Sequence, residues 1–204
     1  AGADAVYAGL RDQTNARAFP GLNFDEAELG QGIAYAHARG RQVYLALNTY
    51  PDSIRLPQWL RAVDRAAALG ADAIIAAEMA VLDYAARRYP QLARHLSVQG
   101  SATTAAALRY AHERFGIARA VLPRVLSVQQ VERLCAASPV PLEVFAFGSL
   151  CIMVEGRCQL SSYVTGQSPN RHGVCSPASF VRWDEHPDNS RSVRVNDMLI
   201  DRFA

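Results

Sequence analysis

The chain has 204 residues, of which half are hydrophobic and a fifth are charged. That balance is typical of a globular protein with a sizeable core, and it excludes a disordered tail or a collagen-like chain. The formal net charge of +2 is too small to argue for nucleic acid as the partner. Without an apolar run of about 18 residues or a basic leader, we expect no membrane span and no secretory signal, which favours the cytoplasm.

A short phrase occurs twice, as GADAVY at residues 2–7 and as GADAII at residues 70–75. In each copy a glycine of the helix C-cap type precedes a short apolar strand. The first copy opens the chain, although a helix should stand before it. We therefore expect the chain to be truncated at its N-terminus.

Helical and extended patterns then alternate along the chain. Asp25 and Glu28 predict a capping box at the start of a helix that Gly40 ends. Pro57 suits the first turn of a second helix, with Trp59 on its apolar face. Further predicted elements are strands at 43–47, 74–75, 96–99, 118–122 and 142–147, and helices at 79–88, at 104–115 and through Val128, Val131 and Cys135.

This alternation predicts an α/β fold in which helices cover a parallel sheet. A doubly wound sheet and a (β/α)8 barrel both fit it, and the lack of a Gly-rich phosphate loop favours the barrel. A complete barrel runs to about 250 residues, so we expect a (β/α)8-barrel-like domain that is truncated at the N-terminus and in its C-terminal half. Residues 1–147 are the alternating β/α portion, and residues 148–204 are an irregular, cysteine-containing segment of the same domain.

Three cysteines, Cys151, Cys158 and Cys175, fall within 25 residues of that segment. Thiolates bind soft metals and iron–sulfur clusters, whereas three buried structural cysteines are the alternative. The spacing lacks the close cysteine pairs of a structural zinc site. Cys135 is expected in the core, so a fourth ligand is expected outside this chain.

Residues 143–151 and 156–161 resemble the signature of the peptidase U32 family. The positions that carry the match are Glu143, Phe145, Gly148, Ser149, Cys151, Gly156, Cys158 and Ser161. The resemblance covers nearly the whole chain, from GADAVY at residues 2–7 to the LIDR at residues 199–202. Within the family, residues 149–153, 175–178 and 181–183 are similar to the ubiquinone biosynthesis branch, the UbiU type.

The resemblance implies a 4Fe-4S cluster held by Cys151, Cys158, Cys175 and a ligand beyond residue 204. It also implies oxygen-independent hydroxylation of ubiquinone precursors in the bacterial cytoplasm, by a heterodimer with a UbiV-like sister subunit and with prephenate as the oxygen donor. Family members that hydroxylate ribosomal or transfer RNA carry a second cysteine four residues after the position of Cys175. Here that position is Ser179, which favours the quinone branch over the RNA branches.

Two other functions stay open. The family name suggests a collagenase-like peptidase, but no Ser-His-Asp or Cys-His order is visible, and His172 and His186 are expected to be solvated loop residues. The chain is alternatively a scaffold subunit, with a structural cluster and a partner that holds the active site.

Polar residues at the C-terminal ends of the strands are the candidates for chemistry in a parallel barrel. Those that follow the predicted strands are Asn48, Glu78, Gln99, Ser101 and Arg124, each of which also has an ordinary role as a helix cap or a loop hydrogen-bonder. Gln99 and Ser101 are expected to point into the mouth of the barrel. Arg17, in the first loop beside Asn15, and Arg124 are candidates to bind a carboxylate such as prephenate.

Glu143 is a charged residue within an apolar predicted strand. A buried carboxylate requires a partner, for which Arg157 and Arg182 are the candidates. Alternatively, Glu143 influences the properties of the cluster by interacting with the residues that surround its ligands.

Overall fold

The computed structural model describes residues 2–18, 21, 23–147, 158–172, 181–188, 190–195 and 198–203. Cys151, Cys175 and Ser179 lie outside the described residues, as does Arg157. The predicted cluster is therefore represented in the structure by Cys158 alone.

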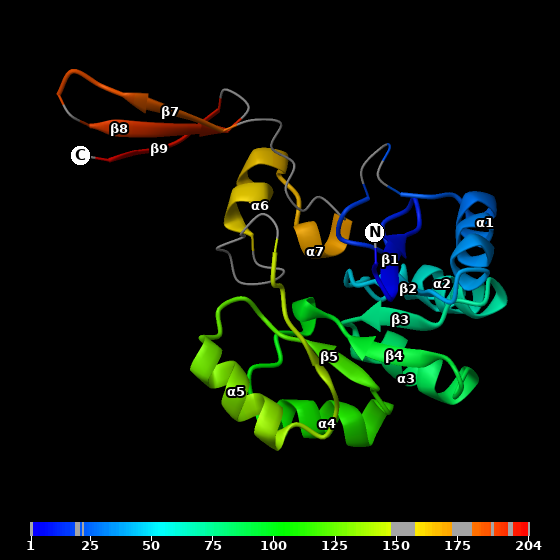
Figure 1. The fold of residues 1–204 in the computed structure, drawn as a ribbon. Coiled ribbons are helices and arrows are strands. Elements are labelled where there is room, and N and C mark those ends of the chain that lie inside the picture. Colours follow the sequence, from blue (N-terminus) through cyan, green and yellow to red (C-terminus); the bar gives the residue numbers. More distant parts are fainter. Residues whose placement is uncertain are drawn as a thin grey trace.

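Six strands form one parallel sheet in which every strand pairs with the next along the chain. They are β1 (Ala5–Gly9), β2 (Gln42–Leu47), β3 (Ala73–Ala76), β4 (Ala93–Leu96), β5 (Arg119–Val121) and β6 (Leu142–Glu143). A doubly wound sheet reverses its strand order at a switch point, whereas the order here runs from β1 to β6 without a break. The winding is that of a barrel wall, and the described residues form an open half-barrel (Figure 1).

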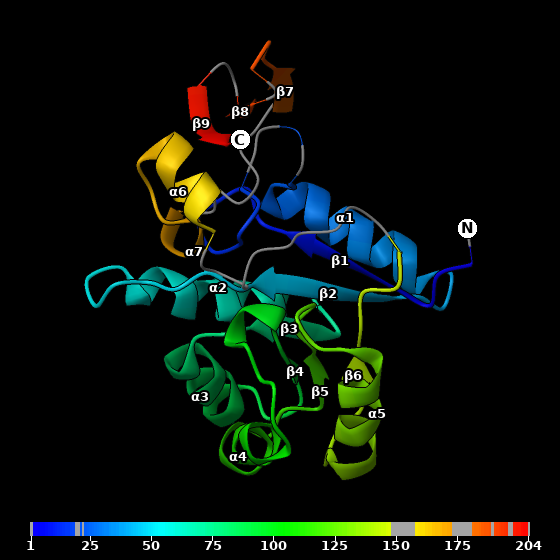
Figure 2. The ribbon, with the colours of Figure 1, turned by 90° about the vertical axis from the view of Figure 1, so that its left-hand side faces the viewer.

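Helices connect the strands and cover the outer side of this sheet (Figure 2). They are α1 (Glu26–His37), α2 (Leu56–Ala68), α3 (Met79–Arg88), α4 (Ala105–Phe115) and α5 (Val128–Ala137), with a short 3-10 helix, η1 (Val98–Gly100), after β4. The predicted capping box is confirmed, since Asp25 accepts from the backbone of Glu28 and the Glu28 side chain accepts from the backbone of Asp25. Gly70 has a φ of +77°, as predicted for a glycine that ends a helix before a strand.

The core lies between the sheet and its helices. Leu45 and Ile74 of the sheet are fully buried against Trp59 and Val63 of α2. Burying side chains of this size stabilises the fold by roughly 1.5–3 kcal/mol each. The Trp59 indole also donates to the carbonyl of Thr49 at 3.0 Å, which anchors the end of β2 to α2.

Three expectations about individual elements are wrong. The strand predicted at 96–99 lies at Ala93–Leu96 instead, because the Ser97 side chain accepts from the Gln99 backbone and starts the η1 turn. The strand predicted at 142–147 is confined to Leu142–Glu143. Cys135 is exposed rather than in the core, because α5 buries Leu134 against the sheet.

The described part of residues 148–204 contains regular elements. Two short helices, α6 (Gln159–Thr165) and α7 (Pro169–His172), precede an antiparallel sheet of β7 (Val181–Glu185), β8 (Arg191–Val195) and β9 (Met198–Phe203). This small sheet stands apart from the barrel wall (Figure 1). No helix among the described residues is long and apolar enough to cross a membrane.

The loop after β1 is held by two buried asparagines that meet at Gly9. The Asn15 amide donates to the Leu10 carbonyl at 2.6 Å, and its oxygen accepts from the Arg17 backbone at 2.9 Å. The Asn23 amide donates to the Arg17 carbonyl. A Cβ on Gly9 would lie 2.7 Å from both asparagine side chains, so this close approach requires glycine.

We expect Gly9→Ala to lower the free energy of unfolding by about 1–3 kcal/mol, because the added methyl group must displace both asparagines. Gly32→Ala is the matched control, since Gly32 lies within α1 with open space around it. Alanine there should raise the stability by up to about 1 kcal/mol. Urea denaturation of the two variants measures both changes, and equal effects would contradict the role of Gly9.

Candidate functional site: the C-terminal rim of the half-barrel

The turn after β2 holds the loop after β1 at the C-terminal rim of the sheet. Asn48 accepts from the backbone of Ala16 at 3.0 Å. The Thr49 backbone donates to the Thr14 carbonyl, and its hydroxyl donates to the Gln13 carbonyl. These bonds fix the loop after β1 over the end of β2, so Asn48 has a structural role at the rim.

The predicted site residues Arg17 and Glu78 have different surroundings at this rim. Arg17 is exposed, while its backbone is fixed on both sides by Asn15 and Asn23. A guanidinium on a fixed backbone is a suitable anchor for a carboxylate that enters from solvent. Glu78, in contrast, accepts from the backbone of Ala80 as the N-cap of α3, which is the ordinary role.

Gln99 and Ser101 form a constrained turn at the end of β4. Gln99 is 9% exposed, and its side-chain oxygen is buried without a hydrogen-bond donor among the described residues. Ser101 adopts a left-handed conformation, with a φ of +51°, which is uncommon for a residue other than glycine. Backbone strain of this kind gathers at functional sites. Gln99 is thus the predicted rim residue whose surroundings fit a ligand-binding role best.

The helix α7 packs onto the same rim. The Tyr50 backbone donates to the Asn170 carbonyl at 2.6 Å, and the Tyr50 hydroxyl donates to the Gln99 carbonyl at 2.9 Å. Arg171 forms an ion pair with Asp52 at 2.9 Å. The pKa of Asp52 is lowered, first by the hydrogen bond from the Arg55 backbone and further by its two arginine partners. This clamp brings the cysteine-bearing segment to the end of β2, next to Gln99.

Cys158 is the N-cap of α6, and its sulfur accepts from the Ser161 backbone at 3.3 Å. Backbone N–H groups directed at sulfur stabilise thiolate ligands and tune cluster potentials, so this surrounding fits a cluster ligand. Among the described residues no group of three or more metal-binding side chains gathers. The other two predicted ligands, Cys151 and Cys175, lie outside that part of the chain.

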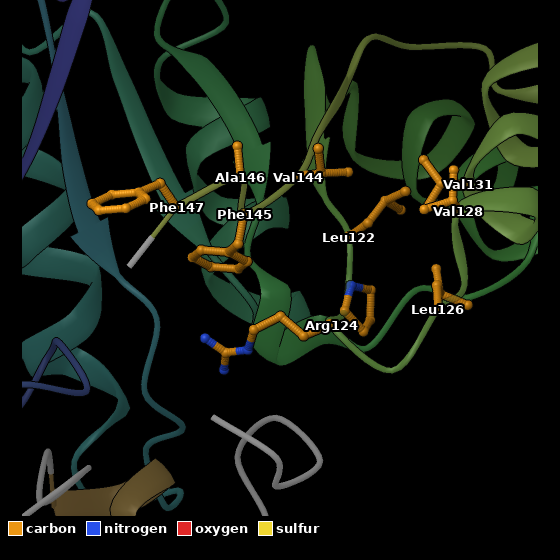
Figure 3. Close-up of a pocket in the computed structure, with 10 residues that line it drawn as sticks. Leu122, Arg124, Leu126, Val128, Val131, Val144, Phe145, Ala146 and Phe147 are labelled. Atoms are coloured by element: carbon orange, nitrogen blue, oxygen red, sulfur yellow. The ribbon is translucent and has the colours of Figure 1, made fainter. Parts of the chain in front are cut away.

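An apolar cavity of about 410 Å³ opens at the ends of β5 and β6 (Figure 3). Its lining comes from the β5–α5 connection, from α5 and from the chain after β6: Leu122, Pro123, Arg124, Leu126, Val128, Val131, Val144, Phe145, Ala146 and Phe147. Arg124 is its charged residue, and the guanidinium carbon lies 4.7 Å from the Phe145 ring centroid. A volume of this size and an apolar lining with few polar groups are typical of small-molecule sites.

Glu143 has a partner that the sequence did not suggest. Its carboxylate lies 3.5 Å from the guanidinium of Arg119 on the neighbouring strand. Of the two partners that were expected, Arg157 is outside the described residues and the side chain of Arg182 is not described. Glu143 therefore belongs to a polar face of the sheet rather than to an apolar strand.

His95 is a buried titratable residue that the sequence analysis missed. It is 5% exposed, and its ring meets the Tyr44 ring edge-to-face at a centroid distance of 4.6 Å. Burial lowers the pKa of His95 to about 4, and the charge of Arg119 contributes to the same shift. The sequence signal for this residue was a histidine inside a short strand. It was missed because the strand was predicted at 96–99, whereas β4 begins three residues earlier, at Ala93.

Comparison with known proteins identifies the family. The sequence model of peptidase family U32 matches residues 1–192. The chain belongs to peptidase family U32. This confirms the resemblance at the level of the family.

Relatives within this family carry several names. The chain is 31% identical to tRNA hydroxylation protein P of Escherichia coli, over 97% of this chain and 43% of that protein. It is 29% identical to the 23S rRNA 5-hydroxycytidine C2501 synthase of the same organism, over 98% of this chain and 29% of that protein. It is 34% identical to a collagenase of Porphyromonas gingivalis, over 86% of this chain and 44% of that protein. The chain thus spans less than half the length of these relatives.

A solved structure supports the fold. The U32 peptidase Mk0906 superimposes with a TM-score of 0.60, over 74% of this chain and 63% of that chain, at 18% sequence identity. The half-barrel is therefore similar to the corresponding part of a U32 peptidase structure.

Stability should depend on pH through His95. Its folded pKa of about 4 is lower than the ordinary value of 6.5, so the unfolded chain binds more protons between these values, and stability falls as the pH drops through this range. Between pH 7.5 and pH 5 the loss from this residue should be about 2 kcal/mol. Denaturant titrations of the wild type and of His95→Gln test this, and parallel stability curves for the two proteins would refute it.

Proposed function

We propose that this chain carries part of an oxygen-independent hydroxylase that acts on ubiquinone precursors. In this proposal Cys151, Cys158 and Cys175 hold a 4Fe-4S cluster, and the fourth ligand lies outside the 204 residues. A UbiV-like sister subunit is the partner, and prephenate is the oxygen donor. The observation that carries the proposal is the surrounding of Cys158, whose sulfur accepts a backbone N–H bond on a segment clamped to the barrel rim.

The cluster supplies electron transfer when it is bound, and the remaining chemistry must come from protein and cosubstrates. In a hydroxylation without O2, a C–H bond of the substrate becomes C–OH while a C–OH bond of the donor becomes C–H. Two electrons pass from substrate to donor, so atoms and electrons balance without an external oxidant. The chain's own task is to hold both molecules at the rim and to exclude water.

The cavity at the ends of β5 and β6 suits an apolar substrate. Its lining is aliphatic and aromatic, and Arg124 stacked on Phe145 offers one cation to a phenolate or a carboxylate. A phenol with a hydrocarbon tail matches that composition. Arg17, after β1, and Gln99, after β4, are the groups that we assign to the oxygen donor.

RNA is the second candidate substrate, since relatives that are about 30% identical are named as tRNA and rRNA hydroxylation proteins. RNA recognition requires phosphate contacts from a basic surface and stacking platforms for bases. The net charge of +2 and the apolar lining of the cavity favour the quinone precursor instead. Ser179, at a position where the RNA branches carry a cysteine, favours the same conclusion.

A test of the substrate class uses a deletion strain grown without oxygen. We expect the quinone pool to lack its hydroxylated products, with a C–H precursor accumulating, while the hydroxylated nucleosides of tRNA and rRNA stay at wild-type levels. Mass spectrometry of lipid extracts and of digested RNA measures both. Loss of a hydroxylated nucleoside with an intact quinone pool would replace the quinone assignment with the RNA assignment. Loss of neither would leave the peptidase.

A second test addresses the cluster. The full-length protein, purified without oxygen, should contain about four irons and four sulfides, and Cys158→Ala should lose most of this content. Cys135→Ala is the matched control, because Cys135 is exposed on α5 and should be dispensable. Iron and sulfide analysis with absorbance spectra measures the difference. A full complement of iron in Cys158→Ala would remove Cys158 from the ligand set.

A further inference from the structure

Three polar side chains lie on one face of the neighbouring strands β4, β5 and β6. The strand register pairs His95 with Arg119, and it pairs Glu143 with Val121, two residues after Arg119. Residues two apart along a strand point to the same side. Ala120, which lies between them, belongs to the core beneath the helices. The polar residues therefore occupy the opposite, concave face of the half-barrel.

This composition differs from that of an ordinary barrel interior, which branched apolar side chains fill. Among the described residues the Arg119 and Glu143 side chains are 38% and 42% exposed. His95 beside them is 5% exposed, and its Nδ1 atom has no hydrogen-bond partner among the described residues. Buried polar atoms are ordinarily paired. The buried Nδ1 atom of His95, which has no described partner, thus lies on the strand next to Arg119, whose side chain is partly exposed.

We propose that this concave face binds a small-molecule carboxylate between the Arg119 guanidinium and the His95 imidazole. The planar guanidinium matches a carboxylate in a two-pronged geometry. A neutral imidazole adds one N–H donor from whichever nitrogen carries the proton. The Tyr44 ring, packed edge-on to His95, holds the imidazole in place.

The charges on this face favour a carboxylate over a phosphate. The Glu143 carboxylate lies 3.5 Å from the Arg119 guanidinium, so it repels any anion bound there, and a dianion most. His95 adds no second positive charge, because burial and then Arg119 keep its pKa far below neutrality. One guanidinium and one neutral donor match a singly charged group.

The inference does not depend on the quinone assignment. The proposed function places the oxygen donor at Arg17 and Gln99, so this face serves a different ligand, a cosubstrate or regulator that carries one carboxylate. Titration with benzoate, which has one carboxylate, and with prephenate, which has two, tests this. We expect benzoate to bind more tightly at this face, whereas tighter binding of prephenate through Arg119 would contradict a site for a singly charged group. Failure of the hydroxylation test would leave these binding measurements valid.

Isothermal titration of the full-length protein tests the site. We expect benzoate to bind, inorganic phosphate to bind at least tenfold more weakly, and Arg119→Gln to weaken benzoate binding by about tenfold or more. Arg41→Gln is the matched control, because Arg41 also pairs with a carboxylate, that of Asp4 at 3.0 Å, but lies directly before β2, three strands away from β5. It should bind within a factor of about two of the wild type. Absence of binding, or equal effects of the two variants, would overturn the proposal.

Nuclear magnetic resonance of the protein labelled with ¹⁵N-histidine locates the ligand directly. The ring resonances that His95→Gln removes are those of His95, and they should shift when benzoate saturates the wild type. His95→Phe should weaken binding, while His95→Gln, which keeps a donor and an acceptor, should recover part of it. Circular dichroism confirms that each variant is folded. Benzoate binding that leaves the His95 resonances unchanged would place the ligand elsewhere and overturn the assignment.

Discussion

The rim of the half-barrel depends on the hydrogen bonds of three consecutive residues, Asn48, Thr49 and Tyr50. Asn48 and Thr49 fix the loop after β1, and Trp59 of α2 donates to the Thr49 carbonyl. Tyr50 reaches both η1 and α7, which come from distant parts of the chain. Thr49 is fully buried, so leaving one of its own hydrogen-bonding partners unpaired would cost about 1–3 kcal/mol. One short turn thus determines where Arg17, Gln99 and the cysteine-bearing segment lie relative to one another.

The two faces of the sheet have different chemistry, and the strand register determines which residue belongs to which face. Leu45, Ile74 and Ala120 face the helices and are fully buried. The concave face carries Arg119 and Glu143, whose side chains are partly open to solvent. A charged pair costs little where water still reaches it, whereas it would be expensive within the packed layer under the helices. Polar function is therefore compatible with a stable core, because the two occupy opposite sides of the same strands.

The sequence predicted the helices better than the short strands, for a physical reason. Helix α3 begins and ends where the pattern placed it, and the capping box at Asp25 is a local signal that needs no tertiary context. Strand β4 was misplaced because Arg94 and His95 are polar, and only pairing with β3 makes them extended. Cys135 was assigned to the core because the apolar residues of α5 alone do not determine which side of the helix is buried. Packing against the sheet buries the neighbouring residue, Leu134. Sequence gave no sign of the Arg119–Glu143 pair, since the register between two strands is not a local property.

The clamp and the apolar cavity occupy different parts of the rim. Cys158 lies on the segment that Asp52 and Arg171 clamp to the end of β2. The cavity lined by Arg124 and Phe145 lies elsewhere on the rim, at the ends of β5 and β6, and it makes none of those clamp contacts. Substitution of Arg124 should therefore leave the clamp and Cys158 in place. Phe145 both carries the family resemblance and lines the cavity, so under the proposed function the search for specificity is best directed to lining residues before β6, such as Arg124 and Val128.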